Sequence, residues 1–246
     1  MKTQNYLIAI LFAFLLGGCS QANIDDKTIV IGASSTPHAL ILEEAKEFIE
    51  SHNYALDIIV MADYVTPNIA LDSGDIDANY FQHLPYLTDF NANNGTDLVS
   101  VVKVHFEPLG IYGGKKTTID NIQTSDTVIV PNDTSNKARA LDLLTIHGLT
   151  NCNIIEMEAQ AIPSALQDAE YAVINGNYAL SSGVVDKVII TESPTSDIAQ
   201  VMGNIIAVKR GNEHKPAIEL LVEAITQENI RDFIEDTFGA SVIPLF

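Results

Sequence analysis

Apolar, β-branched runs alternate with helix-like segments along most of the chain, and this alternation restricts the fold more than any other feature. TIVIGA (28–33), ALDIIVM (55–61) and LVSVVKVHF (98–106) have the composition of buried strands. KPAIELLVEAI (215–225) has the periodicity of a helix with one apolar face. Strands that alternate with helices predict an α/β fold with mixed, mostly parallel sheets and helices on both faces.

Three polar clusters each follow an apolar strand directly. They are NYFQH (79–83), PNDTSNKAR (131–139) and INGNY (174–178). In α/β folds, ligands bind in crevices at the carboxyl ends of the strands. We therefore expect the three clusters to line one shared cleft.

The first cluster belongs to an aromatic concentration, DANYFQHLPYL (77–87), in a chain that has no Trp and is only 7% aromatic. These rings either fill the core or form a wall against an apolar or thioether ligand side chain. Neighbours on a regular strand point to opposite faces, so Tyr80 and Phe81 are not both expected to face the cleft.

The second cluster predicts the start of a helix, with Thr134 or Ser135 as the N-cap and Gly148 after its end. Free N–H groups at a helix N-terminus suit an anion such as a carboxylate, and Arg139 on the first turns adds a guanidinium. A simple N-cap with a surface arginine is the alternative interpretation.

Asparagines follow two further strands. Asn175 comes after a buried run, and Asn204 lies in an otherwise apolar segment. An amide side chain donates and accepts, as recognition of an amino-acid headgroup requires, although Asn-Gly is also a turn signal. The chain has no G-x-S-x-G, P-loop or H-E-x-x-H motif, and its six histidines lack metal-ligand spacing. We therefore expect neither an enzyme nor a metal site.

The N-terminus has the pattern of a lipoprotein signal peptide. Lys2 precedes an apolar run from Tyr6 to Leu16, and Gly17 and Gly18 lead into Cys19. We expect cleavage after residue 18 and lipidation of Cys19, with acyl chains such as palmitate anchoring the exported protein to a bacterial membrane. An ordinary signal peptide with an incidental cysteine is the alternative.

Charge excludes one class of partner. Without residues 1–18 the chain keeps 12 basic and 32 acidic side chains, a net charge of −20. Non-specific nucleic-acid binding needs clustered Lys and Arg, so no nucleic acid is expected. With Cys19 lipidated, only Cys152 remains, and no intramolecular disulfide can form.

Several segments, taken together and in order, resemble the methionine-binding lipoproteins of bacterial ABC importers, the NlpA-type substrate-binding family. The segments are ADYVTPNIALDSGDIDANYFQH (62–83), DANYFQHLPYLTDF (77–90), PNDTSNKARALDLL (131–144), EMEAQAIPSAL (156–166), AVINGNYAL (172–180) and GASVIPLF (239–246). The resemblance covers about Thr28 to Phe246.

The resemblance implies a two-lobed, periplasmic-binding-protein-like fold of type II, with the ligand cleft between the lobes. Lobe 1 would combine residues 28–108 with 206–246, and lobe 2 would be residues 109–205, after the signal peptide (1–18) and a tether (19–27). The implied function is capture of L-methionine and its delivery to an ABC permease and its ATPase, without a cofactor.

The resemblance also assigns roles to eight residues by motif. Arg139 is similar to the family's carboxylate-binding arginine, with Asn136 beside it in the same motif. Asn175 and Asn204 are similar to the residues with which the family contacts the polar headgroup of its ligand. The expected aromatic pocket consists of Tyr64, Phe81, His83 and Tyr86. No ammonium partner is assigned, and Glu158 is one candidate. Another apolar amino acid, a Met-containing dipeptide, or a surface lipoprotein with an idle pocket are the alternatives.

Overall fold

The computed structural model describes residues 27–246. The predicted signal peptide (1–18), the lipidation site Cys19 and all but the last residue of the predicted tether (19–27) lie outside the described residues. Between residues 27 and 246, no helix has both the length and the apolar composition needed to cross a membrane.

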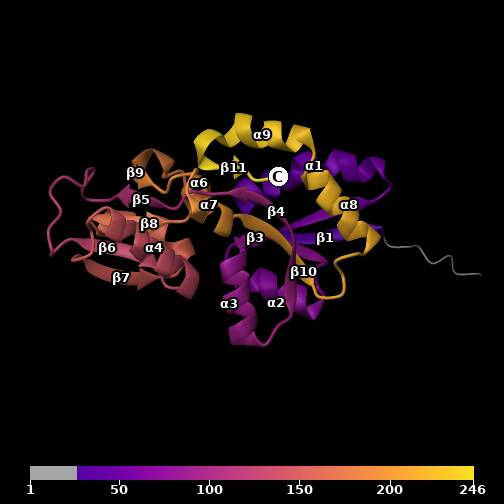
Figure 1. Ribbon diagram of the computed structural model, residues 1–246, viewed down its shortest axis with the longest axis horizontal. Coiled ribbons are helices and arrows are strands. Elements are labelled where there is room, and N and C mark those ends of the chain that lie inside the picture. Colours follow the sequence, from indigo (N-terminus) through magenta and orange to yellow (C-terminus); the bar gives the residue numbers. More distant parts are fainter. Residues whose placement is uncertain (1–26) are drawn as a thin grey trace, which may run out of the picture.

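The first sheet has six strands in the order β11-β4-β10-β3-β1-β2 (Figure 1). β1 pairs in parallel with β2 and β3, whereas β10 lies antiparallel between β3 and β4. The strands are β1 (Thr28–Ala33), β2 (Ala55–Val60), β3 (Ala78–His83), β4 (Leu98–Phe106), β10 (Asn204–Lys209) and β11 (Ile243–Pro244).

The second sheet has five strands in the order β7-β6-β8-β5-β9. β6 pairs in parallel with β7 and β8, and β5 lies antiparallel between β8 and β9. The strands are β5 (Gly110–Gly113), β6 (Thr127–Pro131), β7 (Asn153–Met157), β8 (Tyr171–Ile174) and β9 (Val188–Thr191). The prediction of an α/β fold with mixed sheets is confirmed, but the expectation that they are mostly parallel is wrong: four of the described strand pairs are parallel and five are antiparallel.

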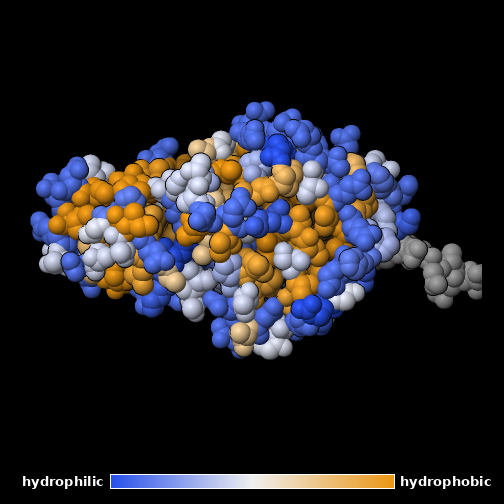
Figure 2. Space-filling view, viewed as in Figure 1, coloured by the Kyte–Doolittle hydropathy of each residue, from blue (hydrophilic) through white to orange (hydrophobic). Residues whose placement is uncertain are grey.

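Helices cover both faces of the first sheet (Figure 1). α1 (Leu40–Ser51), α8 (Pro216–Ile225) and α9 (Glu228–Phe238) pack on one face, and α2 (Thr66–Ser73) and α3 (Leu84–Asn94) on the other. β10 shows why both faces are buried: Ile206 and Val208 join one core, and Ile205 and Ala207 join the other. The outer face of α9 is hydrophilic (Figure 2).

The second sheet is covered in the same way. α4 (Thr134–Ile146) packs on one face, and α5 (Ile162–Ala165) and α6 (Gly176–Ser181) pack on the other. α7 (Asp197–Val201) leads into β10. The remaining short helices are η1 (Ser35–Ala39), η2 (Ala159–Ala161), η3 (Leu166–Asp168), η4 (Val185–Lys187) and η5 (Gly239–Ser241).

The chain crosses between the two sheets twice. The first crossing lies between Phe106, the end of β4, and Gly110, the start of β5. The second lies between Thr191, the end of β9, and Asn204, the start of β10. The architecture is therefore two-lobed, as expected. The lobe boundaries at 108/109 and 205/206 stay a prediction.

Two local features differ from the sequence expectations. The aromatic run continues into α3, a helix that was not predicted, with Pro85 in its first turn and Gly95 in the left-handed conformation (φ 68°) after its end. The N-cap of α4 is Asp133, and the prediction of Thr134 or Ser135 is wrong. The Asp133 carboxylate accepts the N–H of Asn136 at 2.9 Å. The hydroxyl of Thr134, one residue later, does not accept this N–H.

Candidate functional site

All eight residues predicted to bind ligand line one cavity between the two sheets. These are Tyr64, Phe81, His83, Tyr86, Asn136, Arg139, Asn175 and Asn204. Four further residues complete the lining: Gln82, Gly176 and Asn177, which belong to the predicted clusters, and Glu107, which was not predicted.

The three polar clusters meet because each reaches the end of a strand or directly follows one, and these strands end at the same opening. β3 ends at His83, α4 follows β6 and carries Asn136 and Arg139, and Asn175 directly follows β8. The Asn-Gly pair at 175–176 begins α6 and does not form a simple turn. The structure therefore brings together the shared cleft that the strand-end pattern indicated.

Aromatic rings form one side of the cavity. The ring centroids of Tyr64, Phe81 and Tyr86 lie 5.8–6.1 Å from one another. Tyr178, from the other lobe, lies 4.9 Å from Tyr64. Tyr80 points the other way, as the strand alternation required, and is fully buried in the core of the first lobe. The ring faces give a wall suited to an apolar or thioether side chain.

Hydrogen bonds join the two lobes across this wall. The Tyr64 hydroxyl donates to Asn177 Oδ1 at 2.6 Å, and the Tyr178 hydroxyl donates to the carbonyl of Ala62 at 3.0 Å. Each of these tyrosines comes from a different lobe. The described conformation is therefore a closed one, in which the cavity is screened from solvent.

A chain of hydrogen bonds sets the polarity of the cavity. The Asp133 carboxylate only accepts, so Asn136 must present its Nδ2 there, at 3.0 Å. Asn136 Oδ1 therefore faces the cavity and accepts from His83 Nε2 at 3.1 Å and from Asn175 Nδ2 at 2.9 Å. His83 Nδ1 accepts the N–H of Tyr86. Burial and the nearby Arg139 lower the pKa of His83 to about 4, so His83 is neutral.

Arg139 is the only cationic side chain that lines the cavity, and most of its guanidinium is occupied. Nε donates to Glu192 Oε1 at 2.8 Å, and Nη2 donates to Glu192 Oε2 and to the Glu107 carbonyl. Both side chains are buried, with 4% and 5% exposed. Within residues 27–246, Nη1 makes no hydrogen bond. Arg139 therefore offers one N–H edge to a ligand.

Two sequence expectations about charge need correction. The N-terminus of α4 was expected to hold a ligand carboxylate, but the Asp133 carboxylate already caps it. Glu158 was a candidate ammonium partner, but it lies exposed at the surface, where it accepts from Asn132 Nδ2 at 2.8 Å. Glu107 is the carboxylate that lines the cavity.

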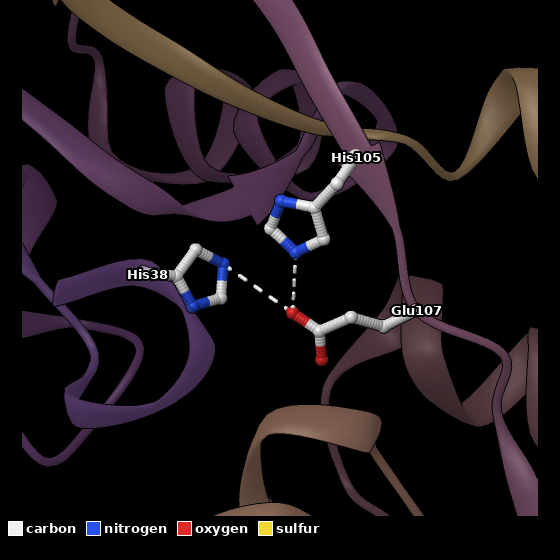
Figure 3. A group of neighbouring side chains, drawn as sticks. All are labelled: His38, His105 and Glu107. Atoms are coloured by element: carbon white, nitrogen blue, oxygen red, sulfur yellow. Dashed lines mark hydrogen bonds and ion pairs between the residues drawn. The ribbon is translucent and has the colours of Figure 1, made fainter. Parts of the chain in front are cut away.

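Glu107 belongs to a buried cluster with two histidines (Figure 3). Its Oε1 accepts from His105 Nε2 at 2.8 Å and lies 3.4 Å from His38 Nε2, which also donates to Asn204 Oδ1 at 3.1 Å. The Tyr80 hydroxyl donates to His105 Nδ1. Burial lowers the pKa of His38 to about 4 and that of His105 to about 3. Both histidines are therefore neutral donors.

The cluster is also the place among the described residues where a metal ion could find three ligands. The donor atoms of His38, His105 and Glu107 lie within 4.8 Å of one another. No two histidines have metal-ligand spacing in the sequence. The fold nevertheless brings His38 and His105 together, so the expectation that each histidine stands alone is wrong for these two. Hydrogen bonds already account for the contacts of Glu107 Oε1, and we interpret the cluster as a positioning network.

Glu107 and Glu192 are the functional residues that sequence reasoning missed. Each directly follows the strand that leads into a crossing between the lobes, β4 for Glu107 and β9 for Glu192. The strand-end pattern that selected Asn175 could therefore have found both. No sequence signal indicates that Glu192 and Arg139 pair, since they are 53 residues apart.

Comparison with known proteins identifies the family. The NlpA lipoprotein family matches residues 29–154 and 149–246. The chain belongs to the NlpA lipoprotein family. The Methionine-binding lipoprotein MetQ of Bacillus subtilis is 30% identical, with 97% of this chain and 96% of that protein covered.

Two solved structures are also similar. A periplasmic substrate-binding protein of an ABC transporter from Coxiella burnetii is 31% identical, with a TM-score of 0.81 over 88% of this chain and 100% of its own. A nutrient binding protein from Burkholderia cenocepacia, bound to methionine, is 31% identical, with a TM-score of 0.82 over 89% and 100%. This NlpA lipoprotein is a substrate-binding protein and not an enzyme.

Proposed function

We propose that the chain binds L-methionine in the interlobe cavity and delivers it to an ABC permease and its ATPase, while the lipid on Cys19 holds it at the membrane. The observation that carries the proposal is the meeting of an aromatic wall and one available guanidinium edge in a single cavity between the lobes.

Each end of the ligand has a partner. Arg139 Nη1 donates to the ligand carboxylate, and Asn204 is a further polar contact for the headgroup. Tyr64, Phe81 and Tyr86 enclose the thioether, which makes favourable contacts with aromatic rings. The similarity to MetQ of B. subtilis and to the methionine-bound B. cenocepacia structure supports this ligand class.

L-Methionine is expected to raise the melting temperature of the lipid-free chain that lacks residues 1–19. A ligand at about 1,000 times its Kd that binds only the folded state adds about 4 kcal/mol. For a domain of this size that corresponds to roughly 10 °C. The measurement is a thermal melt after refolding, which removes carried-over ligand, with each of the twenty amino acids and D-methionine.

The same melts test the alternatives. A shift with a different amino acid, or with a Met-containing dipeptide, would keep the site and change the cargo. The absence of any shift with amino acids and dipeptides would contradict the proposal and favour a surface lipoprotein with an idle pocket.

A further inference from the structure

Glu107 is the one carboxylate among the residues that line the cavity, and the structure holds it in a fixed position. It is 95% buried (5% exposed) and lies on the first crossing between the lobes. His105 and His38 fix Oε1 (Figure 3). Oε2 lies over Gly176, where an added Cβ would come within 2.8 Å of it. Gly176 therefore permits the close approach of the carboxylate to the start of α6.

Asn175 supplies a second acceptor at the same place. Asp133 fixes the amide of Asn136, and Asn136 Oδ1 in turn fixes Asn175 with its Nδ2 as the donor. Among residues 27–246, Asn175 Oδ1 is then left without a hydrogen-bond partner, although the residue is only 7% exposed. A buried acceptor without a donor costs free energy, so the site is suited to a ligand that brings a donor.

The charges of the cavity also call for a cation. The ion pair with Glu192 balances Arg139, and His38, His83 and His105 are neutral. When Glu107 is ionised, no further cation among the described lining residues balances it, and burial alone raises its pKa. A buried charge is tolerated only when it is paired and hydrogen-bonded.

We propose that Glu107 and Asn175 Oδ1 form the subsite for the protonated amino group of the ligand. The inference rests on the proposed function and deepens it, because it restricts the cargo to compounds with a free, cationic amino group. N-acylated and deaminated compounds are excluded, since they leave Glu107 unbalanced and Asn175 Oδ1 without a donor. His38 and His105 are positioning residues that orient the carboxylate.

The test compares three ligands with the unaltered chain by titration calorimetry. They are L-methionine, N-acetyl-L-methionine and 4-(methylthio)butanoate, which lacks only the amino group. Loss of one partner of a buried charge pair typically weakens binding by at least about 30-fold. We expect that loss for both analogues. Equal affinity for L-methionine and 4-(methylthio)butanoate would overturn the subsite while leaving the proposed function intact.

A charge-neutral variant gives the second measurement. Glu107→Gln is expected to weaken L-methionine binding by at least about 30-fold and to leave 4-(methylthio)butanoate binding nearly unchanged, so that the discrimination disappears. Glu158→Gln, which removes an exposed carboxylate outside the cavity, is the matched control and should bind like the unaltered chain. If Glu107→Gln still binds L-methionine much more tightly than 4-(methylthio)butanoate, the assignment of Glu107 to the amino-group subsite is wrong.

Three results separate the explanations. If no amino acid binds the unaltered chain, the proposed function and the subsite both fail. If zinc chloride alone stabilises the unaltered chain, and Glu107→Gln abolishes that effect, the cluster is a metal site and the inference is wrong. If Glu107→Gln does not fold, the three-ligand comparison on the unaltered chain alone decides whether the amino-group subsite exists.

Discussion

Replacement of Arg139 by alanine is expected to weaken L-methionine binding by about 2–5 kcal/mol, or about 30- to 5,000-fold in Kd. The physical reason is that Nη1 is the available edge of the one cationic side chain in the cavity lining. Titration calorimetry on the refolded chain measures the effect. Near-normal affinity would show that Arg139 does not hold the ligand carboxylate.

The Arg139→Ala variant also loses stability, and the two effects have to be separated. Glu192 is only 5% exposed and would be left as an unpaired buried charge, which costs about 3–5 kcal/mol of unfolding free energy. Arg139→Met combined with Glu192→Leu removes both charges and should regain most of that stability without regaining binding. Urea unfolding measures the first quantity and calorimetry the second.

The control for this experiment is an ion pair outside the cavity. Arg210 and Asp97 pair at 2.8 Å, but their side chains are 59% and 63% exposed. Exposed pairs contribute about 0–1 kcal/mol, so Arg210→Ala should change stability little and leave the affinity unchanged. A comparable loss of binding in Arg210→Ala would indicate a general effect of charge and not a specific contact.

Acidification is expected to destabilise the protein strongly between pH 7 and pH 5. Burial lowers the pKa of His38 and His83 to about 4 and that of His105 to about 3, whereas the unfolded chain titrates near 6.5. Below pH 6.5 the unfolded state therefore binds more protons, so the unfolding free energy falls as the pH falls.

One group opposes this trend. Burial raises the pKa of Glu107, so the native state takes up that proton at a higher pH than the unfolded chain does. The contribution of Glu107 to the unfolding free energy is complete below the pKa that it has in the unfolded chain. This contribution is lost as the pH rises through the pKa that it has in the folded chain. Three buried histidines outweigh one glutamate, so the net effect of lowering the pH from 7 to 5 is a loss of unfolding free energy.

Urea unfolding at several pH values in that range measures the pH dependence. His38→Gln should make it less steep, because one buried neutral histidine is removed. His214→Gln is the matched control, since its side chain is 93% exposed in the folded state. A stability that is flat between pH 7 and 5, or a slope that His38→Gln leaves unchanged, would contradict the assignment of neutral buried histidines.

Much of the fold could be predicted because the signals for it are local. Alternation of apolar runs with helical periodicity predicted the α/β architecture, and the strand at Leu98–Phe106 has the bounds that its composition indicated. The helix of residues 66–73 ends at Gly74 (φ 85°), and a glycine in the left-handed conformation is a local signal for such an end. α3 was missed although Pro85 and Gly95 marked both of its ends.

The candidate site was only partly predictable, because the sequence signals for it are also local. Phe81 lies near the end of β3, Asn136 in the first turn of α4 after β6, and Asn175 directly after β8. Such positions gather at one opening by topology alone. The strand period also placed Tyr80 and Phe81 on opposite faces. These relations depend on the spacing of residues along a strand and on the direction of the strands.

The sequence by itself determined the architecture, the aromatic wall and the residues at the strand ends. Only the tertiary structure decided how the charges are shared. It paired Arg139 with Glu192, placed Glu107 between His38 and His105, and left Asn175 Oδ1 without a donor. The physical reason is that periodicity and capping act over a few residues, whereas the pairing of a buried charge depends on which distant segments the fold brings within hydrogen-bonding distance.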